Sequence, residues 1–164
     1  MHTHSTRTAD HPRLSRPSAV TDRPWLWASA PGFCFPLREA PATPHGKWLW
    51  FLPVRALDAG WRLVQEAVED GKLGPGAKAA TLGNPFGGDP TRRPVIVYTA
   101  DCTDEDDVTR VLATLRALGV NDALPYKTDE ATALGEYGDR TSLYTSPAGT
   151  TKVVRRTPRY TAPA

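Results

Sequence analysis

Three lysines lie in or beside segments of strand-like composition, and this placement suits the binding of a phosphate or carboxylate group. Lys47 opens an aromatic run, Lys78 lies in a short apolar segment, and Lys127 closes another. Arg140 precedes a further strand-like segment. Singly, such cations usually form surface ion pairs, whereas several on one sheet face would bind an anion. The sequence leaves open whether they converge.

Two pairs of tryptophans have the period-two spacing of a β-strand. Trp25 pairs with Trp27, and Trp48 pairs with Trp50. In each pair both indoles lie on one face of an extended segment. Such rings either pack in the core, which is the commoner outcome, or stack on a planar ligand.

Other familiar sites are missing from the sequence. The glycine-rich residues 83–88 lack the following Lys-Ser/Thr of a phosphate-binding loop, and no dinucleotide fingerprint occurs. Cys34 and Cys102 have no zinc-ligand spacing, so we expect two buried, reduced thiols in a cytoplasmic protein. We predict no metal and no cofactor. His45 is the only histidine in the predicted folded region.

The elements that must position these side chains alternate between strands and helices. Asp58 is a candidate helix cap, followed by apolar residues at helical spacing as far as Gly71. Thr103 is the candidate cap of a second helix, which stops at Gly119. The predicted strands are residues 25–27, 47–52, 77–82, 95–99, 123–127 and 141–144, with a short edge at 153–154.

The predicted element order, β-α-β-β-α-β-β, favours an α+β fold. A mostly antiparallel sheet backed on one face by two main helices fits it best. We expect a single domain at residues 25–150, a disordered basic arm at 1–24 and a basic tail at 151–164.

Charge and hydropathy limit the partners. The formal net charge is +2, and basic residues concentrate at both ends, which favours weak contact with polyanions through these ends. No apolar run is long enough to span a membrane, and no signal peptide is recognisable. The oligomeric state is left open.

Seven blocks of the sequence together resemble the basophilic-leukaemia-expressed protein (Bles) family. The similarity spans about residues 25–146. The blocks are residues 46–49, 61 with 66–75, 77–78, 97–99, 103–108, 115–119 and 126–129. The resemblance implies a fold similar to the cap-binding translation initiation factor, a curved antiparallel sheet backed by helices. Bacterial members often carry the name phosphothreonine lyase, and the Ala/Arg/Gly/Pro-rich composition suggests a bacterial source.

A lyase of this kind would remove phosphate from phosphothreonine or phosphoserine by β-elimination. The reaction needs a base for the α-proton, an acid for the leaving oxygen and cations for the phosphate. The acid would be Tyr126 or Tyr137, and His45 would be the catalytic histidine that the resemblance implies. The candidates for the base and the phosphate clamps are Lys47, Lys78 and Lys127.

The alternative is a non-enzymatic module that binds a phosphorylated nucleotide-like ligand or a peptide partner. The initiation-factor fold holds a methylated guanine between two tryptophan rings and its phosphates with cations. The ligand-binding candidates are Trp48, Trp50, Tyr137 and Arg140. Of the two hypotheses, we lean towards the lyase.

Overall fold

A seven-stranded antiparallel sheet organises the residues that the computed structural model describes, which are 15–85, 88–129 and 142–156. The strand order is β1-β3-β4-β2-β5-β6-β7. The strands are β1 (Trp25–Ser29), β2 (Gly46–Pro53), β3 (Gly76–Ala80), β4 (Arg92–Thr99), β5 (Leu124–Thr128), β6 (Tyr144–Ser146) and β7 (Val154–Arg155). The helices are η2 (Pro17–Ala19), α1 (Val54–Glu69) and α2 (Glu105–Ala117). This curved sheet with two helices confirms the predicted fold class.

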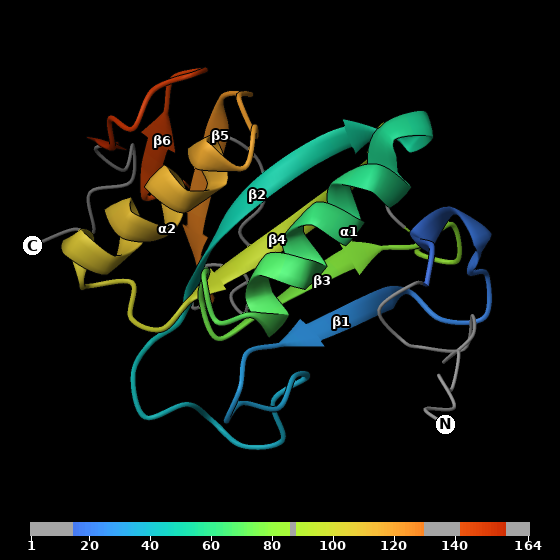
Figure 1. Cartoon of the computed structure of the whole chain (residues 1–164), viewed down its shortest axis with the longest axis horizontal. Coiled ribbons are helices and arrows are strands. Elements are labelled where there is room, and N and C mark those ends of the chain that lie inside the picture. Colours follow the sequence, from blue (N-terminus) through green and yellow to red (C-terminus); the bar gives the residue numbers. More distant parts are fainter. Residues whose placement is uncertain (1–14, 86–87, 130–141, 157–164) are drawn as a thin grey trace, which may run out of the picture.

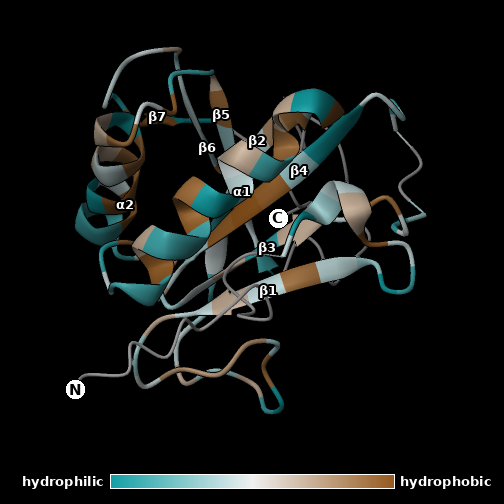
Figure 2. Ribbon diagram, turned by 45° about the vertical axis from the view of Figure 1, so that its right-hand side comes forward, coloured by the Kyte–Doolittle hydropathy of each residue, from teal (hydrophilic) through white to brown (hydrophobic). Residues whose placement is uncertain are grey.

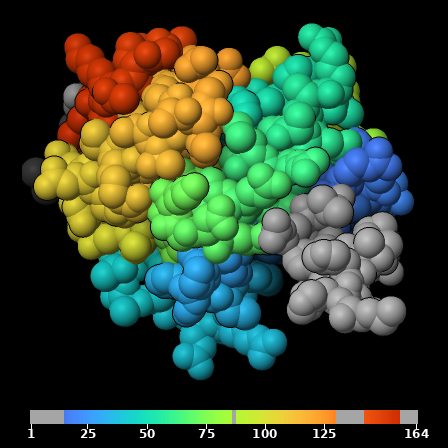
Figure 3. Space-filling view, viewed as in Figure 1, coloured from blue at the N-terminus to red at the C-terminus, as the bar shows by residue number. Residues whose placement is uncertain are grey.

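Helices α1 and α2 lie on the same side of the sheet, as Figure 1 shows. Strand β2 pairs with β4 along its whole length and with β5 at its start. Seen from the helix side in Figure 3, the atoms of α1 (green) and α2 (yellow) cover the middle of the sheet. None of the helices in the described ranges is both long and apolar enough to cross a membrane.

Helix α1 begins earlier than predicted. Its N-cap is Pro53, whose extended backbone ends β2 and whose fixed φ leads directly into the helix. Asp58, the predicted cap, lies inside the helix and accepts hydrogen bonds from Ser18 instead. The helix ends at Glu69 and is followed by Gly71, whose φ of +74° favours glycine, as the sequence predicted.

Helix α2 is capped by Asp104 rather than by the predicted Thr103. The Asp104 carboxylate accepts a hydrogen bond from the Asp107 backbone N–H at 3.2 Å. Thr103 instead donates its hydroxyl to Asp101 at 2.6 Å. The acidic first turn complements the positive end of the helix dipole. In Figure 2 the hydrophobic, brown side of α2 faces the strands and the hydrophilic, teal side faces outward.

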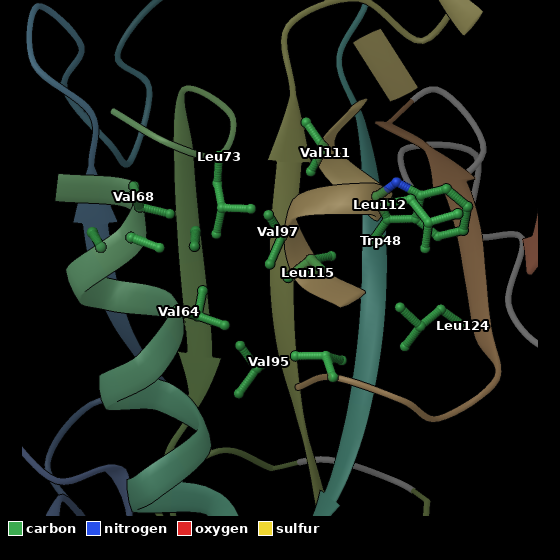
Figure 4. Close-up of a cluster of buried hydrophobic side chains, with 14 of the residues drawn as sticks. Trp48, Val64, Val68, Leu73, Val95, Val97, Val111, Leu112, Leu115 and Leu124 are labelled. Atoms are coloured by element: carbon green, nitrogen blue, oxygen red, sulfur yellow. The ribbon is translucent and has the colours of Figure 1, made fainter. Parts of the chain in front are cut away.

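The main core lies between the helices and the sheet. Figure 4 shows Val64 and Val68 of α1 and Val111, Leu112 and Leu115 of α2 directed towards the strands. All five are buried, and the sheet contributes Trp48, Val95, Val97 and Leu124 to the same cluster. The two tryptophans of the core, Trp48 and Trp61, are each only 1% exposed.

Residues 15–24 are ordered, which corrects part of the predicted disordered arm. Pro17 is buried, and the Ser18 backbone N–H donates to the Asp58 carboxylate of α1 at 2.9 Å. The Ser18 hydroxyl donates to the other oxygen of that carboxylate. The low apolar content of the segment predicts disorder. Its hydrogen bonds to Asp58 could not be predicted from local sequence, because Asp58 lies 40 residues from Ser18. Residues 1–14 lie outside the described ranges.

Two smaller predictions also need correction. Strand β6 occupies Tyr144–Ser146 rather than residues 141–144, and residue 141 is outside the described ranges. Cys34, predicted to be buried, is exposed, because it lies in the connection after β1, whose residues 31–34 are all exposed. Cys102 is buried, as predicted. Neither cysteine forms a disulfide within the part of the chain that the structure describes.

Candidate functional site

The face of the sheet opposite α1 and α2, here called the open face, carries the lysines. Side chains alternate between the two faces of a strand, so the burial of Trp48, Ala77, Ala79 and Val97 under the helices places their neighbours on the open face. A second cluster of Phe35, Leu49, Ile96 and Tyr98 forms there, bordered by Trp25, Trp27 and Phe51.

Lys78 lies in an aromatic environment on this face. Its Nζ is 4.0 Å from the ring centroid of Trp25 and 5.0 Å from that of Trp27. The Tyr98 ring lies 5.9 Å from the same atom. Burial, and secondarily the positive charge of Lys47, lower the pKa of Lys78 to about 8. A substantial fraction of Lys78 is therefore uncharged in weakly alkaline solution, and a bound anion would reverse this.

Lys47 lies between a carboxylate and a second lysine. Its Nζ is 3.0 Å from Asp129 Oδ1, and its side chain is only 7% exposed. The β2–β5 register places Lys127 directly beside Lys47, so both side chains share the open face. Lys127 is also buried. Two neighbouring buried lysines, Lys47 and Lys127, therefore lie at this end of the face.

The connection between β1 and β2 brings Phe35 and His45 onto the open face. The Phe35 ring centroid lies 5.1 Å from that of Tyr98 and 6.0 Å from that of His45. Gly76 makes room for the ring, because a Cβ there would lie 2.5 Å from Phe35. Residues 31–34 and 36–44 of the connection are exposed, so Phe35 is its buried contact with the sheet.

A pocket of about 460 Å³ lies beside the Lys47–Asp129 pair. Asp129 and His45 line it, together with Pro41, Ala42, Pro44, Cys102 and Thr128. Burial lowers the pKa of His45, and the negative charge of Asp129 opposes this effect only in part. His45 is therefore largely uncharged at neutral pH.

Four of the predicted site residues meet on the open face. They are His45, Lys47, Lys78 and Lys127, contributed by the start of β2, by β3 and by β5. Tyr137 and Arg140 lie outside the described residues. The structure thus brings Lys47 close enough to Lys78 to lower its pKa and places Lys47 beside Lys127 in the β2–β5 register.

Three predicted residues lie on the helix side and cannot contact a ligand on the open face. Trp48 is buried, and its Nε1 donates to the Val108 carbonyl at 3.1 Å. Trp50 is partly buried, and its Nε1 donates to Asp122 at 2.9 Å. Tyr126 is fully buried with its hydroxyl 2.6 Å from the Thr99 hydroxyl, and burial raises its pKa. The predicted roles of these three residues as ligand contacts or acid are therefore corrected.

The open face also contains Tyr98, Phe35 and Asp129, which were not predicted as site residues, and Trp25 and Trp27, which were predicted either to pack in the core or to stack on a planar ligand. Tyr98 is the register partner of Lys47, and burial raises its pKa, so it keeps its proton and can donate a hydrogen bond. Phe35 and Asp129 contact the face from connecting segments. Trp25 and Trp27 border Lys78. The alternation of side chains along the predicted strands could have assigned strand residues such as Tyr98 to one face of the sheet. Phe35 and Asp129 lie in connecting segments, where no sequence pattern indicates that their side chains contact this face.

This arrangement combines cations, a lysine of lowered pKa and aromatic rings. Buried ammonium groups bind anions strongly because water screens them little. A partly neutral lysine can also accept a proton near neutral pH. The face can therefore bind a phosphate or carboxylate group and can supply a base beside it.

Two solved structures resemble this chain in fold. The complex of C. elegans eIF4E-3 with the 4E-binding protein Mextli and a cap analog matches with a TM-score of 0.53 and 20% identity, over 67% of this chain and 65% of that one. Ascaris suum eIF4E-3 with an m2,2,7G cap matches with a TM-score of 0.48 and 20% identity, over 63% of this chain and 61% of that one. The first likeness confirms the initiation-factor-like fold expected from the family resemblance.

A curated protein of Mycolicibacterium vanbaalenii shares sequence with part of this chain. It is named as a phosphoserine aminotransferase and is 37% identical over 78 residues, which are 48% of this chain. The matched region is 20% of that protein, so this chain spans only about a fifth of the relative's length.

The family model described as basophilic leukemia-expressed protein Bles03 matches residues 35–135. The matched region is more than half of the chain and contains Phe35, His45 and the three lysines of the open face. The sequence blocks that resemble this family and the initiation-factor-like fold agree with this match. The chain therefore belongs to the family of the basophilic leukemia-expressed protein Bles03.

Proposed function

We propose that the open face binds a phosphate-bearing ligand. The observation that carries the proposal is the position of Lys47 on the buried open face, near Lys78, whose pKa its charge lowers, and beside Lys127 in the β2–β5 register. Lys47 and Lys78 are close enough for the charge of one to lower the pKa of the other. A dianionic phosphate monoester placed between them would relieve this repulsion. Asp129 already balances part of the charge of Lys47.

The geometry supports a phosphate monoester more than a larger polyanion. The three lysines are buried or half-buried, and the exposed β1–β2 connection borders them. A single compact anion suits lysines that are this deeply buried, whereas a polyanion requires an exposed basic surface. The C. elegans neighbour, which has the same fold, binds a cap analog in its structure. A phosphorylated nucleotide-like ligand or peptide is accordingly the alternative to a small phosphorylated amino acid.

Calorimetric titration with N-acetyl-O-phosphothreonine methylamide tests the proposal. We expect saturable binding that Lys78→Met weakens by about 10- to 100-fold, since a hydrogen bond to a charged group contributes roughly 1.5–3 kcal/mol. Lys72→Met is the matched control, because Lys72 is exposed and lies outside the face. Absence of binding, or equal losses in both variants, would reject the phosphate site.

We further propose β-elimination as the reaction of this site, on the basis of the lowered pKa of Lys78. The fraction of Lys78 that is neutral in the complex would take the α-proton of the phosphorylated residue. The electron pair of that C–H bond would form the Cα–Cβ double bond, and the Cβ–O bond would break to release phosphate. Lys47 and Lys127 would hold the leaving phosphate, and one of the two ammonium groups would give its proton to the leaving oxygen.

Mass spectrometry of a phosphothreonine peptide tests the elimination. Loss of phosphoric acid, giving dehydrobutyrine, is the expected result, and Lys78→Met should abolish it. Loss of phosphate with addition of water would identify a phosphatase and exclude elimination. Binding without any change in peptide mass would assign the protein to the non-enzymatic class.

A further inference from the structure

The pocket beside the Lys47–Asp129 pair is lined by residues other than the three lysines. Pro41, Ala42 and Pro44 line it together with Cys102 and Thr128. These residues give the pocket mostly apolar walls. Its volume of about 460 Å³ lies in the range of small-molecule sites in proteins.

One ring nitrogen of His45, which lines this pocket, is buried and unsatisfied. Its side chain is 6% exposed, and its Nδ1 has no hydrogen-bond partner among the residues that the structure describes. Buried polar atoms in proteins are nearly always paired, so an orphaned ring nitrogen at a pocket indicates a missing partner. The neutral imidazole offers one donor and one acceptor nitrogen.

Asp129 connects the pocket to the cations. It lines the pocket, and its Oδ1 is 3.0 Å from Lys47 Nζ. A carboxylate only accepts hydrogen bonds, and it repels a second anion. The pocket is therefore unsuited to the phosphate itself and suited to an uncharged group that carries an N–H or O–H donor.

We propose that this pocket is a second subsite, which takes the amide-bearing part of a phosphorylated amino-acid residue while its phosphate lies on the lysines. This inference rests on the proposed phosphate site. The N–H of the residue donates to Asp129 or His45, and its apolar atoms contact Pro41 and Pro44. The ligand class is thus a phosphorylated residue within a peptide, rather than inorganic phosphate or a phosphorylated sugar.

Two probes separate the pocket from the phosphate site. Inorganic phosphate can occupy only the lysines, whereas N-acetyl-O-phosphothreonine methylamide can occupy both the lysines and the pocket. Calorimetric titration should show the blocked residue binding at least about tenfold more tightly than inorganic phosphate, the equivalent of about one well-made hydrogen bond. The ratio of the two affinities is the readout.

Two substitutions should reduce that ratio towards one. Ala42→Leu fills the pocket from an exposed loop position, and His45→Phe keeps a ring against Phe35 but removes the nitrogen. Circular dichroism checks that both variants are folded. Ala42→Leu needs no core rearrangement, because Ala42 is exposed, so it remains informative if His45→Phe is unstable.

The outcomes distinguish the two proposals. If neither probe binds the unsubstituted protein, the phosphate site fails, and the subsite falls with it. If both probes bind equally well, or if Ala42→Leu weakens both by the same factor, the phosphate site stands and the subsite is rejected. A ratio that is high in the unsubstituted protein and lost in Ala42→Leu supports the subsite.

Discussion

The ionisation of Lys78 shows how an aromatic setting changes the chemistry of a single residue. An ammonium over two indoles gains cation–π attraction, yet the same rings displace the water that would stabilise its charge. The neighbouring Lys47 adds repulsion, and the result is a pKa of about 8. Exposed lysines titrate more than two pH units higher. The open face therefore holds a cation that gives up its proton readily when no anion is present.

This lowered pKa predicts a pH dependence of anion binding. Phosphate is a dianion above about pH 7, so its own ionisation contributes little there. As the pH rises through about 8, Lys78 of the ligand-free protein loses its proton. Binding of the anion above this pH then requires Lys78 to take up a proton, which weakens the binding. The affinity for inorganic phosphate should fall by up to about tenfold per pH unit between about pH 8 and 9.5. Calorimetry at several pH values measures this slope.

Lys78→Arg is the control for the pH dependence. The guanidinium stays charged across this range, so the affinity of the variant should be nearly constant. Equal slopes in the two proteins would show that a group other than Lys78 controls binding.

At the scale of strands, the alternation of side chains between the two faces of the sheet determines which of the predicted site residues lie on the same face. Lys47 and Trp48 are adjacent in sequence, as are Tyr126 and Lys127, so members of each pair lie on opposite faces. Assigning both members to one site was therefore inconsistent with the strands predicted for them. The period-two rule, applied strictly, would have placed the lysines on one face and Trp48, Trp50 and Tyr126 on the other.

The main helices and strands could be predicted from local sequence, whereas several residues of the open face could not. Helical spacing and the glycines after each helix predicted α1 and α2, and aromatic runs predicted β2 and β4. The pairing of Lys47 with Tyr98 depends on register between distant strands. Phe35 and Asp129 reach the face from connecting segments, where composition gives no direction to a side chain.

The two faces predict different outcomes for two tryptophan substitutions. Trp48→Ala should lower the free energy of unfolding by about 3–5 kcal/mol, because it removes a fully buried indole from the core. Trp25→Ala should cost less than about 1.5 kcal/mol, because that ring is half-buried at the edge strand. Urea unfolding measures both values. Similar losses would contradict the assignment of Trp48 and Trp25 to core and open face.

At the scale of the whole molecule, the folded unit extends further towards the N-terminus than composition suggested. Residues 17–24 pair with the segment after β3, where the Leu82 N–H donates to the Pro17 carbonyl at 3.3 Å and the Gly83 N–H donates to the Val20 carbonyl at 3.2 Å. Ser18 fixes the same segment to Asp58 of α1. Polar contacts, the buried Pro17 and the packing of Val20 against the main core therefore hold a segment that has few large apolar residues.

Two truncations test this boundary. A chain that begins at residue 15 keeps every described contact of residues 15–24 and is the reference for the comparison by urea unfolding. A chain that begins at residue 25 should lose about 1–3 kcal/mol, because Asp58 and the backbone of residues 81–83 lose their partners. Asp58→Ala in the full chain should reproduce about half of that loss, which separates the polar anchor from the effect of chain length. Equal stability of both truncated chains would mean that residues 15–24 lie against α1 without stabilising it.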